Sequence, residues 1–212
     1  MQSYHAEIIK RLKRHYPNAH YYLSFSTPLE LLVAAILSAQ VKDEIVNAVT
    51  PILFKKYKSA EDYANTPISE IERDISSITF YKNKAKNIRA TCKIIIEKHN
   101  GNVPNTIEEL TSLPGIARKT ANVILANAFN IISGIPVDTH YIRLAYRLGL
   151  TSSHNPVIIE KDSMRLIPKQ YWSNLPHLLK AHGRLICKAP NPYCSKCFLN
   201  DICPKKGVIK QL

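Results

Sequence analysis

The chain of 212 residues is 45% hydrophobic and 21% charged, which allows a sizeable core and excludes a globally disordered chain. It carries 29 Lys and Arg residues against 16 Asp and Glu residues, so its formal net charge is +13. This positive charge predicts a polyanionic partner, with nucleic acid as the first candidate and an anionic membrane surface as the second. A proteome that is rich in lysine throughout would also explain the charge.

The N-terminal sequence contains no recognisable targeting signal. Residues 1–16 include several charged side chains and have no apolar core. The most apolar run, residues 29–37, is too short to cross a bilayer. We therefore expect a soluble intracellular protein without a membrane partner. In a bacterium it would be cytoplasmic, and a eukaryotic nucleus or organelle is the alternative.

The first half of the chain shows helical patterns. A helix is predicted from Pro28, because apolar residues repeat at three- and four-residue spacing as far as Leu37. The next position on the same face is Gln40. Two further helices are predicted over about 44–57 and about 68–78.

A longer helix is predicted over residues 83–99 and ends before Gly101. The apolar residues on its inward stripe are Ala85, Ile88, Cys92, Ile95 and Ile96. The lysines expected on its outer face are Lys84, Lys86, Lys93 and Lys98. Because Cys92 lies on the inward stripe, we interpret it as a buried core thiol.

The second half of the chain is also helical. Thr106–Glu109 is a capping-box pattern that opens a short helix, and Leu113–Ala117 (Leu-Pro-Gly-Ile-Ala) breaks this helix before another begins. Asp138 occupies an N-cap position before a helix that ends near Gly149, and two more helices fit within residues 157–187. No segment alternates with period two, so we predict an all-α fold.

The two helices joined by Leu113–Ala117 form a unit suited to binding phosphate. Pro114 and Gly115 allow a tight turn, and the helix that follows presents backbone N–H groups and the positive end of its dipole. Arg118 and Lys119 add positive charge at the same place. An ordinary hairpin inside a helical bundle is the alternative interpretation of a Pro-Gly turn.

Four of the five cysteines lie close together near the C-terminus. They are Cys187, Cys194, Cys197 and Cys203. Because a reducing compartment disfavours disulfides, this spacing indicates a metal site, and four thiolates suit either a zinc ion or an iron–sulfur cluster. Zinc ribbons more often contain two Cys-x-x-Cys pairs, whereas this chain has one.

Several segments together resemble the endonuclease III family of DNA-repair enzymes. They are Leu113–Asn122 (Leu-Pro-Gly-Ile-Ala-Arg-Lys-Thr-Ala-Asn), Val137–His140, Leu37–Gln40 and the four C-terminal cysteines. The resemblance implies two helical lobes, residues 22–132 with a helix-hairpin-helix motif and residues 1–21 with 133–212. It also implies a [4Fe–4S] cluster on the four cysteines. The expected partner is duplex DNA with damaged pyrimidines or abasic sites, bound by a nucleoid-associated monomer.

The resemblance implies a bifunctional DNA glycosylase and AP lyase in which Lys119 is the nucleophile. Its amine would attack C1′ of the damaged nucleotide, displace the base and leave a Schiff base, after which β-elimination breaks the strand on the 3′ side. Asp138 is the expected partner that assists departure of the base, although Asp before a helix is also a common N-cap. Without the resemblance, Lys119 would be interpreted as a phosphate-binding residue.

Other residues are expected to contact DNA by the same resemblance. Gln40 and Phe80 are candidates to fill the gap that an extruded nucleotide leaves. The alternatives are an ordinary polar helix end for Gln40 and core packing for Phe80. Asp43 is expected near the base pocket. The remaining expected DNA contacts are Leu113, Gly115, Ala117, Arg118, Arg184, Lys188 and Lys196.

Two features depart from the family pattern. Ala117 stands where the family usually has glycine, and if that position required a positive φ, alanine would cost about 1 kcal/mol. The connection that leads to Asp138 is one residue longer than is common in the family. We therefore expect a remodelled loop over residues 131–135.

Three other functions would explain part of the pattern. A monofunctional adenine-DNA glycosylase shares the implied fold and cluster but lacks the hairpin lysine, so Lys119 argues against it. A non-catalytic DNA-binding module stabilised by a bound metal would share the charge, the hairpin and the cysteines. Only the presence of both Lys119 and Asp138 argues against this alternative. An iron–sulfur electron carrier would leave the basic charge and the hairpin unexplained.

Overall fold

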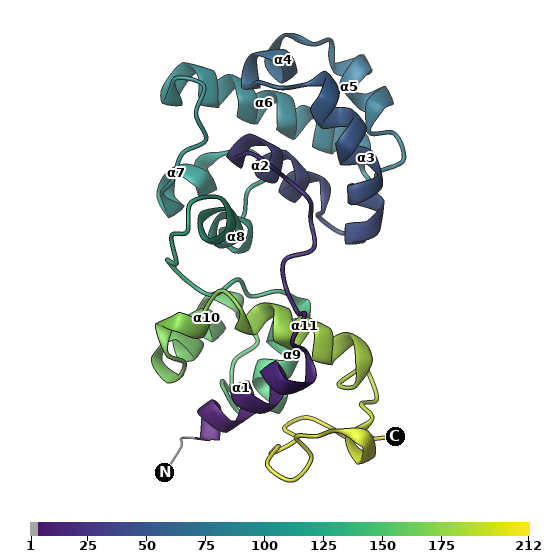
Figure 1. Cartoon of the computed structure of the whole chain (residues 1–212), viewed down its shortest axis with the longest axis vertical. Helices are drawn as coiled ribbons and strands as arrows, with labels where there is room; N and C mark the ends of the chain where they lie inside the picture. Colours follow the sequence, from purple (N-terminus) through teal and green to yellow (C-terminus); the bar gives the residue numbers. More distant parts are fainter. Residues whose placement is uncertain (1–3) are drawn as a thin grey trace. The chain divides into compact units, whose positions relative to one another are not determined.

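The computed structural model describes residues 4–212 and confirms the all-α prediction for them, since this part of the chain contains no β-strand (Figure 1). Its α-helices are α1 (Tyr4–His15), α2 (Pro28–Leu37), α3 (Asp43–Lys56), α4 (Ala60–Asn65), α5 (Ile68–Asp74), α6 (Tyr81–His99), α7 (Ile107–Ser112), α8 (Arg118–Ala128), α9 (Thr139–Arg147), α10 (Pro156–Leu166) and α11 (Leu175–Leu185). Two short 3-10 helices span Lys169–Tyr171 and Cys194–Lys196. Within residues 4–212, every helix is too short or too polar to span a membrane.

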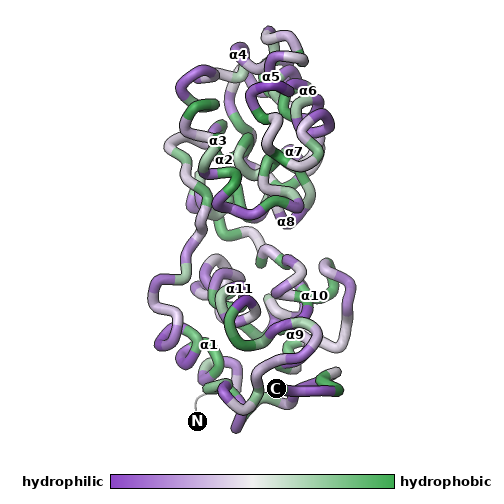
Figure 2. Tube along the Cα trace, turned by 90° about the vertical axis from the view of Figure 1, so that its right-hand side faces the viewer, coloured by the Kyte–Doolittle hydropathy of each residue, from purple (hydrophilic) through white to green (hydrophobic). Residues whose placement is uncertain are grey.

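The chain divides into two compact units. The hairpin unit is Tyr22–Ser133, and the cysteine unit joins the described residues up to Tyr21 with Gly134–Leu212. In the hairpin unit, α6 packs against α2, α4 and α5, while α2 also packs against α3 and α8. In the cysteine unit, α9 packs against α10 and α11, and α1 covers α11. Hydrophobic and hydrophilic residues alternate along the helices of both units, as expected for helices with one buried face (Figure 2).

Helix α2 is the most buried element of the hairpin unit. Every residue of Leu31–Leu37 is buried, so the helix has an apolar neighbour on all sides over its last two turns. Its start is set by Thr27, whose side-chain oxygen accepts a hydrogen bond from the Glu30 amide at 3.2 Å, and by Pro28 in the first turn. Gln40 and its neighbours follow directly after the C-terminus of this helix.

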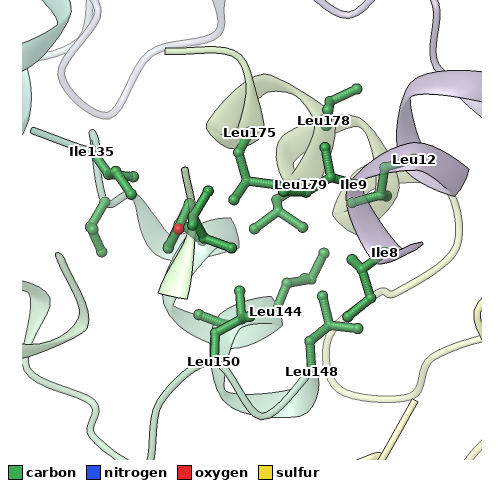
Figure 3. Packing of buried hydrophobic residues seen from close by; sticks show 14 of the residues in the cluster. Ile8, Ile9, Leu12, Ile135, Leu144, Leu148, Leu150, Leu175, Leu178 and Leu179 are labelled. Carbon is green, nitrogen blue, oxygen red and sulfur yellow. The ribbon is translucent and has the colours of Figure 1, made fainter. Parts of the chain in front are cut away.

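The cysteine unit has its own apolar core, which α1, α9 and α11 supply jointly (Figure 3). Helix α1 contributes Ile8, Ile9 and Leu12, each no more than 2% exposed. Leu144 of α9 and Leu179 of α11 are fully buried opposite them. A segment from the start of the chain therefore belongs to the same core as the C-terminal helices.

The sequence patterns predicted most helices and missed two. Helices α1 and α4 were not predicted, and α5 ends at Asp74 rather than near Ile78. The expectation that Lys84 lies on the outer face of its helix is wrong, because this side chain is only 5% exposed. Cys92 is fully buried, which confirms its interpretation as a core thiol.

Candidate functional site

The turn between α7 and α8 is held tightly against the rest of the hairpin unit. Leu113 is only 2% exposed, so its side chain anchors the turn, and any DNA contact there must come from its backbone. The Pro114 carbonyl accepts a hydrogen bond from the Thr91 hydroxyl at 2.9 Å. Gly115 has φ +82°, and a Cβ atom there would lie 2.9 Å from Nδ2 of Asn87. The turn therefore requires glycine at position 115 for both conformation and space.

Helix α8 begins immediately after this turn with exposed basic residues. Ala117 is its N-cap residue and has an extended backbone with φ −86° and ψ 164°. A positive φ is not required there, so the expected penalty for alanine in place of glycine does not arise. The Ala117 side chain makes no capping hydrogen bond to the first turn of α8. Arg118 and Lys119 are the first two residues of α8, and both are exposed.

Asp138 occupies the N-cap of α9 in the cysteine unit. Its Oδ1 accepts a hydrogen bond from the Tyr141 amide at 2.7 Å, which confirms the predicted capping role. The residue is half-buried. His140 lies two residues further on, 3.2 Å from a guanidinium nitrogen of Arg143, and burial lowers its pKa. A neutral imidazole next to this arginine avoids repulsion between two cations.

Gln40 and Phe80 lie in two separate turns of the hairpin unit, and both have a left-handed backbone. Gln40 has φ +57° and Phe80 has φ +60°. Phe80 is 62% exposed, so core packing, which was the alternative for this residue, is excluded. Gln40 is exposed as well. Left-handed residues other than glycine persist only where the surrounding structure holds them. Asp43, expected near the base pocket, is the first residue of α3.

Lys84 is a buried residue that the sequence patterns placed wrongly. Its ammonium group donates hydrogen bonds to the carbonyl oxygens of Leu37, at 2.7 Å, and of Ala39, at 2.8 Å. Burial lowers the pKa of Lys84 to about 8. Hydropathy patterns assign lysine to the solvent face of a helix, and nothing in α6 itself reveals that the partners of Lys84 are the last residue of α2 and the turn after it.

The four C-terminal cysteines line a single, mostly apolar cavity in the cysteine unit. Cys187 follows α11, Cys194 begins the second 3-10 helix, and Cys197 and Cys203 lie in the loop after it. Burial raises the pKa of Cys197 to about 11 and also raises the pKa of Cys203. None of the cysteines among the described residues forms a disulfide. Four thiols around one cavity therefore form a candidate site for a group bound through sulfur.

Two buried polar side chains adjoin this cavity and were not predicted. Arg147 donates to Sγ of Cys187 at 3.3 Å and to the carbonyl oxygens of Lys188 and Pro190. Nε2 of His182 lies 3.5 Å from Sγ of Cys197, and burial lowers the pKa of His182 to about 4. Arg147 therefore places positive charge beside the sulfur atoms and fixes the loop that leads away from Cys187.

The basic residues expected to contact DNA near the cysteines are all exposed. Arg184 lies on the last turn of α11. Lys188 and Lys196 flank Tyr193, with their ammonium nitrogens 5.2 Å and 5.9 Å from the centre of its ring. Cation–π contact of this kind holds the two lysine side chains over the same loop.

Comparisons with known proteins agree with this arrangement. The model of the HhH-GPD superfamily of base excision DNA repair proteins matches residues 33–169. Endonuclease III of Synechocystis sp. is 50% identical over 198 residues, which cover 93% of this chain and 90% of the relative. A solved structure of a non-covalent endonuclease III–DNA complex superimposes with a TM-score of 0.89 at 41% identity, covering 97% of both chains. A trapped endonuclease III–DNA covalent intermediate gives a TM-score of 0.88, with the same identity and coverage. The chain therefore belongs to the endonuclease III family within the HhH-GPD superfamily of base excision repair proteins.

Proposed function

We propose that this protein is a bifunctional DNA glycosylase and AP lyase that removes damaged pyrimidines from duplex DNA and then cleaves the strand 3′ to the abasic site. The observation that carries the proposal is the position of Lys119, an exposed lysine at the second residue of the helix that follows the hairpin turn. Solved complexes of endonuclease III with DNA, including one trapped as a covalent intermediate, support covalent chemistry with DNA in this family.

Lys119 acts as the nucleophile in this proposal. Its neutral amine attacks C1′ of the damaged nucleotide, the base leaves with the electron pair of the glycosidic bond, and the amine becomes a Schiff base to the opened sugar. The positively charged iminium acidifies C2′, so loss of a proton there expels the 3′ phosphate by β-elimination. The start of α8 supplies positive potential that holds the neighbouring phosphates in place.

Asp138 has two roles in the proposal. Its carboxylate stabilises positive charge that develops on the sugar as the base departs, and it caps α9 through the Tyr141 amide. The capping bond fixes the orientation of the carboxylate, because Oδ1 accepts from the Tyr141 amide and Oδ2 is left for the second role. The two roles therefore coexist in one side chain.

The remaining residues bind the duplex without reading its sequence. Backbone groups of Leu113–Ala117 and the side chain of Arg118 hold phosphates, and Gln40 and Phe80 fill the space of the extruded nucleotide. Gln40 and Phe80 each lie in a turn with a left-handed backbone, and Phe80 is exposed, which supports this assignment. Arg184, Lys188 and Lys196 provide further phosphate contacts on the cysteine unit.

For Cys187, Cys194, Cys197 and Cys203 we propose a [4Fe–4S] cluster. Their four thiols line one cavity, and thiolates in such buried surroundings are stable only beside positive charge, which iron ions and Arg147 provide. When bound, the cluster supplies cross-links between α11 and the C-terminal loop rather than a step of the reaction. Iron and sulfide analysis of the wild type and of Cys194→Ser tests the assignment, and stoichiometric zinc without iron would contradict it.

Borohydride trapping tests the proposed activity. Wild-type protein is mixed with a duplex oligonucleotide that carries thymine glycol or an abasic site, and the reductant converts any Schiff base into a stable adduct. We expect the adduct to form with the wild type and with Lys93→Ala, which removes another exposed lysine of the hairpin unit. It should be absent with Lys119→Ala. Tight DNA binding without an adduct in the wild type would overturn the lyase assignment.

A further inference from the structure

The C-terminal end of α2 is capped by a side chain from another helix. The last carbonyl groups of an α-helix have no partner within the helix, and a cation at that end is favourable. The carbonyl oxygens of Leu37 and Ala39 both accept hydrogen bonds from the ammonium group of Lys84, which reaches them from α6. Lys84 therefore bridges the last residue of α2 and the turn beyond it.

This bridge directly precedes Gln40. Within the turn, the hydrogen bonds are short-range: the Ser38 amide donates to Ala34, the Ser38 hydroxyl donates to Ala35, and the Val41 amide donates to Ser38. Gln40 has φ +57°, a conformation that side chains with a Cβ atom rarely adopt. Because Lys84 holds the carbonyl of the preceding residue, Ala39, it fixes the peptide group from which Gln40 projects.

The same residue is joined to the second turn. The Lys84 amide donates to the Phe80 carbonyl at 3.1 Å, which is the first turn of hydrogen bonding in α6. Phe80 is the left-handed residue before α6 and is exposed. One buried lysine thus contacts the two turns that carry Gln40 and Phe80, through its ammonium group and through its backbone.

We propose that Lys84 is a positioning residue that holds Gln40 and Phe80 in register so that both can fill the space of one extruded nucleotide. The proposal rests on the function proposed above for Gln40 and Phe80. A lesion that still carries its base must be unstacked and kept out of the duplex, whereas an abasic site has no base to restack. Loss of Lys84 should therefore impair base removal more than strand cleavage at an abasic site.

The experiment compares single-turnover rates of wild type, Lys84→Met and Lys86→Met on two duplexes. One duplex carries thymine glycol and the other an abasic site, and active sites are counted by borohydride trapping so that misfolded protein does not contribute. We expect Lys84→Met to slow removal of thymine glycol about tenfold or more, as a small misplacement of a positioning group does, with about a threefold effect at most on the abasic duplex. Lys86 is exposed on the same helix, so Lys86→Met should match the wild type on both.

A double-mutant cycle separates positioning from general loss of structure. If Lys84 acts through Gln40, Lys84→Met should have less than about a threefold further effect in a Gln40→Ala background. Equal slowing on both duplexes, or full additivity with Gln40→Ala, overturns the proposal. If Lys84→Met does not fold, Lys84→Arg, which keeps the charge but places its donors differently, must change the ratio of the two rates; an unchanged ratio overturns the proposal. Absence of a trapped adduct in the wild type would instead refute the proposed lyase function.

Discussion

Replacing Gly115 by alanine perturbs the hairpin turn in two ways whose sizes follow from the structure. Gly115 has φ +82°, and alanine in this left-handed region costs about 1 kcal/mol. The new Cβ atom would also lie 2.9 Å from Nδ2 and 3.3 Å from Cβ and Cγ of Asn87, so the half-buried Asn87 side chain must move. Crowding of this kind adds about 1–2 kcal/mol, and the total loss of unfolding free energy should be about 2–3 kcal/mol.

Two matched variants separate these contributions. In an Asn87→Ala background the contacts with Nδ2 and Cγ are absent and only the 3.3 Å contact with Cβ remains, so the cost of Gly115→Ala should fall toward about 1 kcal/mol. Ala117→Gly changes the neighbouring position that already has φ −86°, and its effect should stay within about 0.5 kcal/mol. Urea unfolding followed by circular dichroism measures the wild type, Gly115→Ala, Asn87→Ala, the double variant and Ala117→Gly. A Gly115→Ala protein as stable as the wild type, or an Ala117→Gly protein more stable than the wild type by about 1 kcal/mol or more, would contradict these values.

Four further outcomes are expected. Asn155→Ala should destabilise the protein by about 1 kcal/mol in urea unfolding, because the Asn155 side chain caps α10 through the amides of Val157 and Ile158. Cys92 should resist iodoacetamide until the protein unfolds, since burial raises the pKa of its thiol to about 12; rapid labelling of the folded protein would contradict this. Asp138→Asn should keep the stability of the wild type but lose base removal, whereas Asp138→Ala should lose both, as unfolding and single-turnover assays would show. Burial lowers the pKa of Lys84 to about 8, so between about pH 8 and pH 10 the unfolded chain binds a proton that the folded chain releases; the unfolding free energy of the wild type should rise over this range relative to that of Lys84→Met.

The elements that sequence patterns predicted best are those with a local signal. Helix α2 has an apolar run that begins with Pro28, and α9 has an aspartate at its N-cap; both were predicted from spacing and capping alone. Helix α1 was missed although Ile8, Ile9 and Leu12 lie on one buried face, because charged residues fill the positions between them. The six residues of α4 are too few for a periodic pattern, and its Ser59–Asp62 capping box is the one local signal that was available.

The errors at the candidate site arise where a residue is determined by a distant partner. Comparison with the family pattern raised the question of a positive φ at Ala117, yet in this turn Gly115 carries that requirement and Ala117 has φ −86°. Lys84 was assigned to solvent because hydropathy patterns describe a helix by itself, while the two carbonyl oxygens that make its burial possible belong to a segment about 45 residues earlier in the chain. A buried ammonium group is tolerated only where hydrogen-bond acceptors compensate its lost hydration. A buried lysine therefore indicates that backbone carbonyl groups of another element lie nearby without other donors. In this chain they lie just before Gln40, which is why the least predictable lysine is also the one whose removal should most specifically affect extrusion of a base.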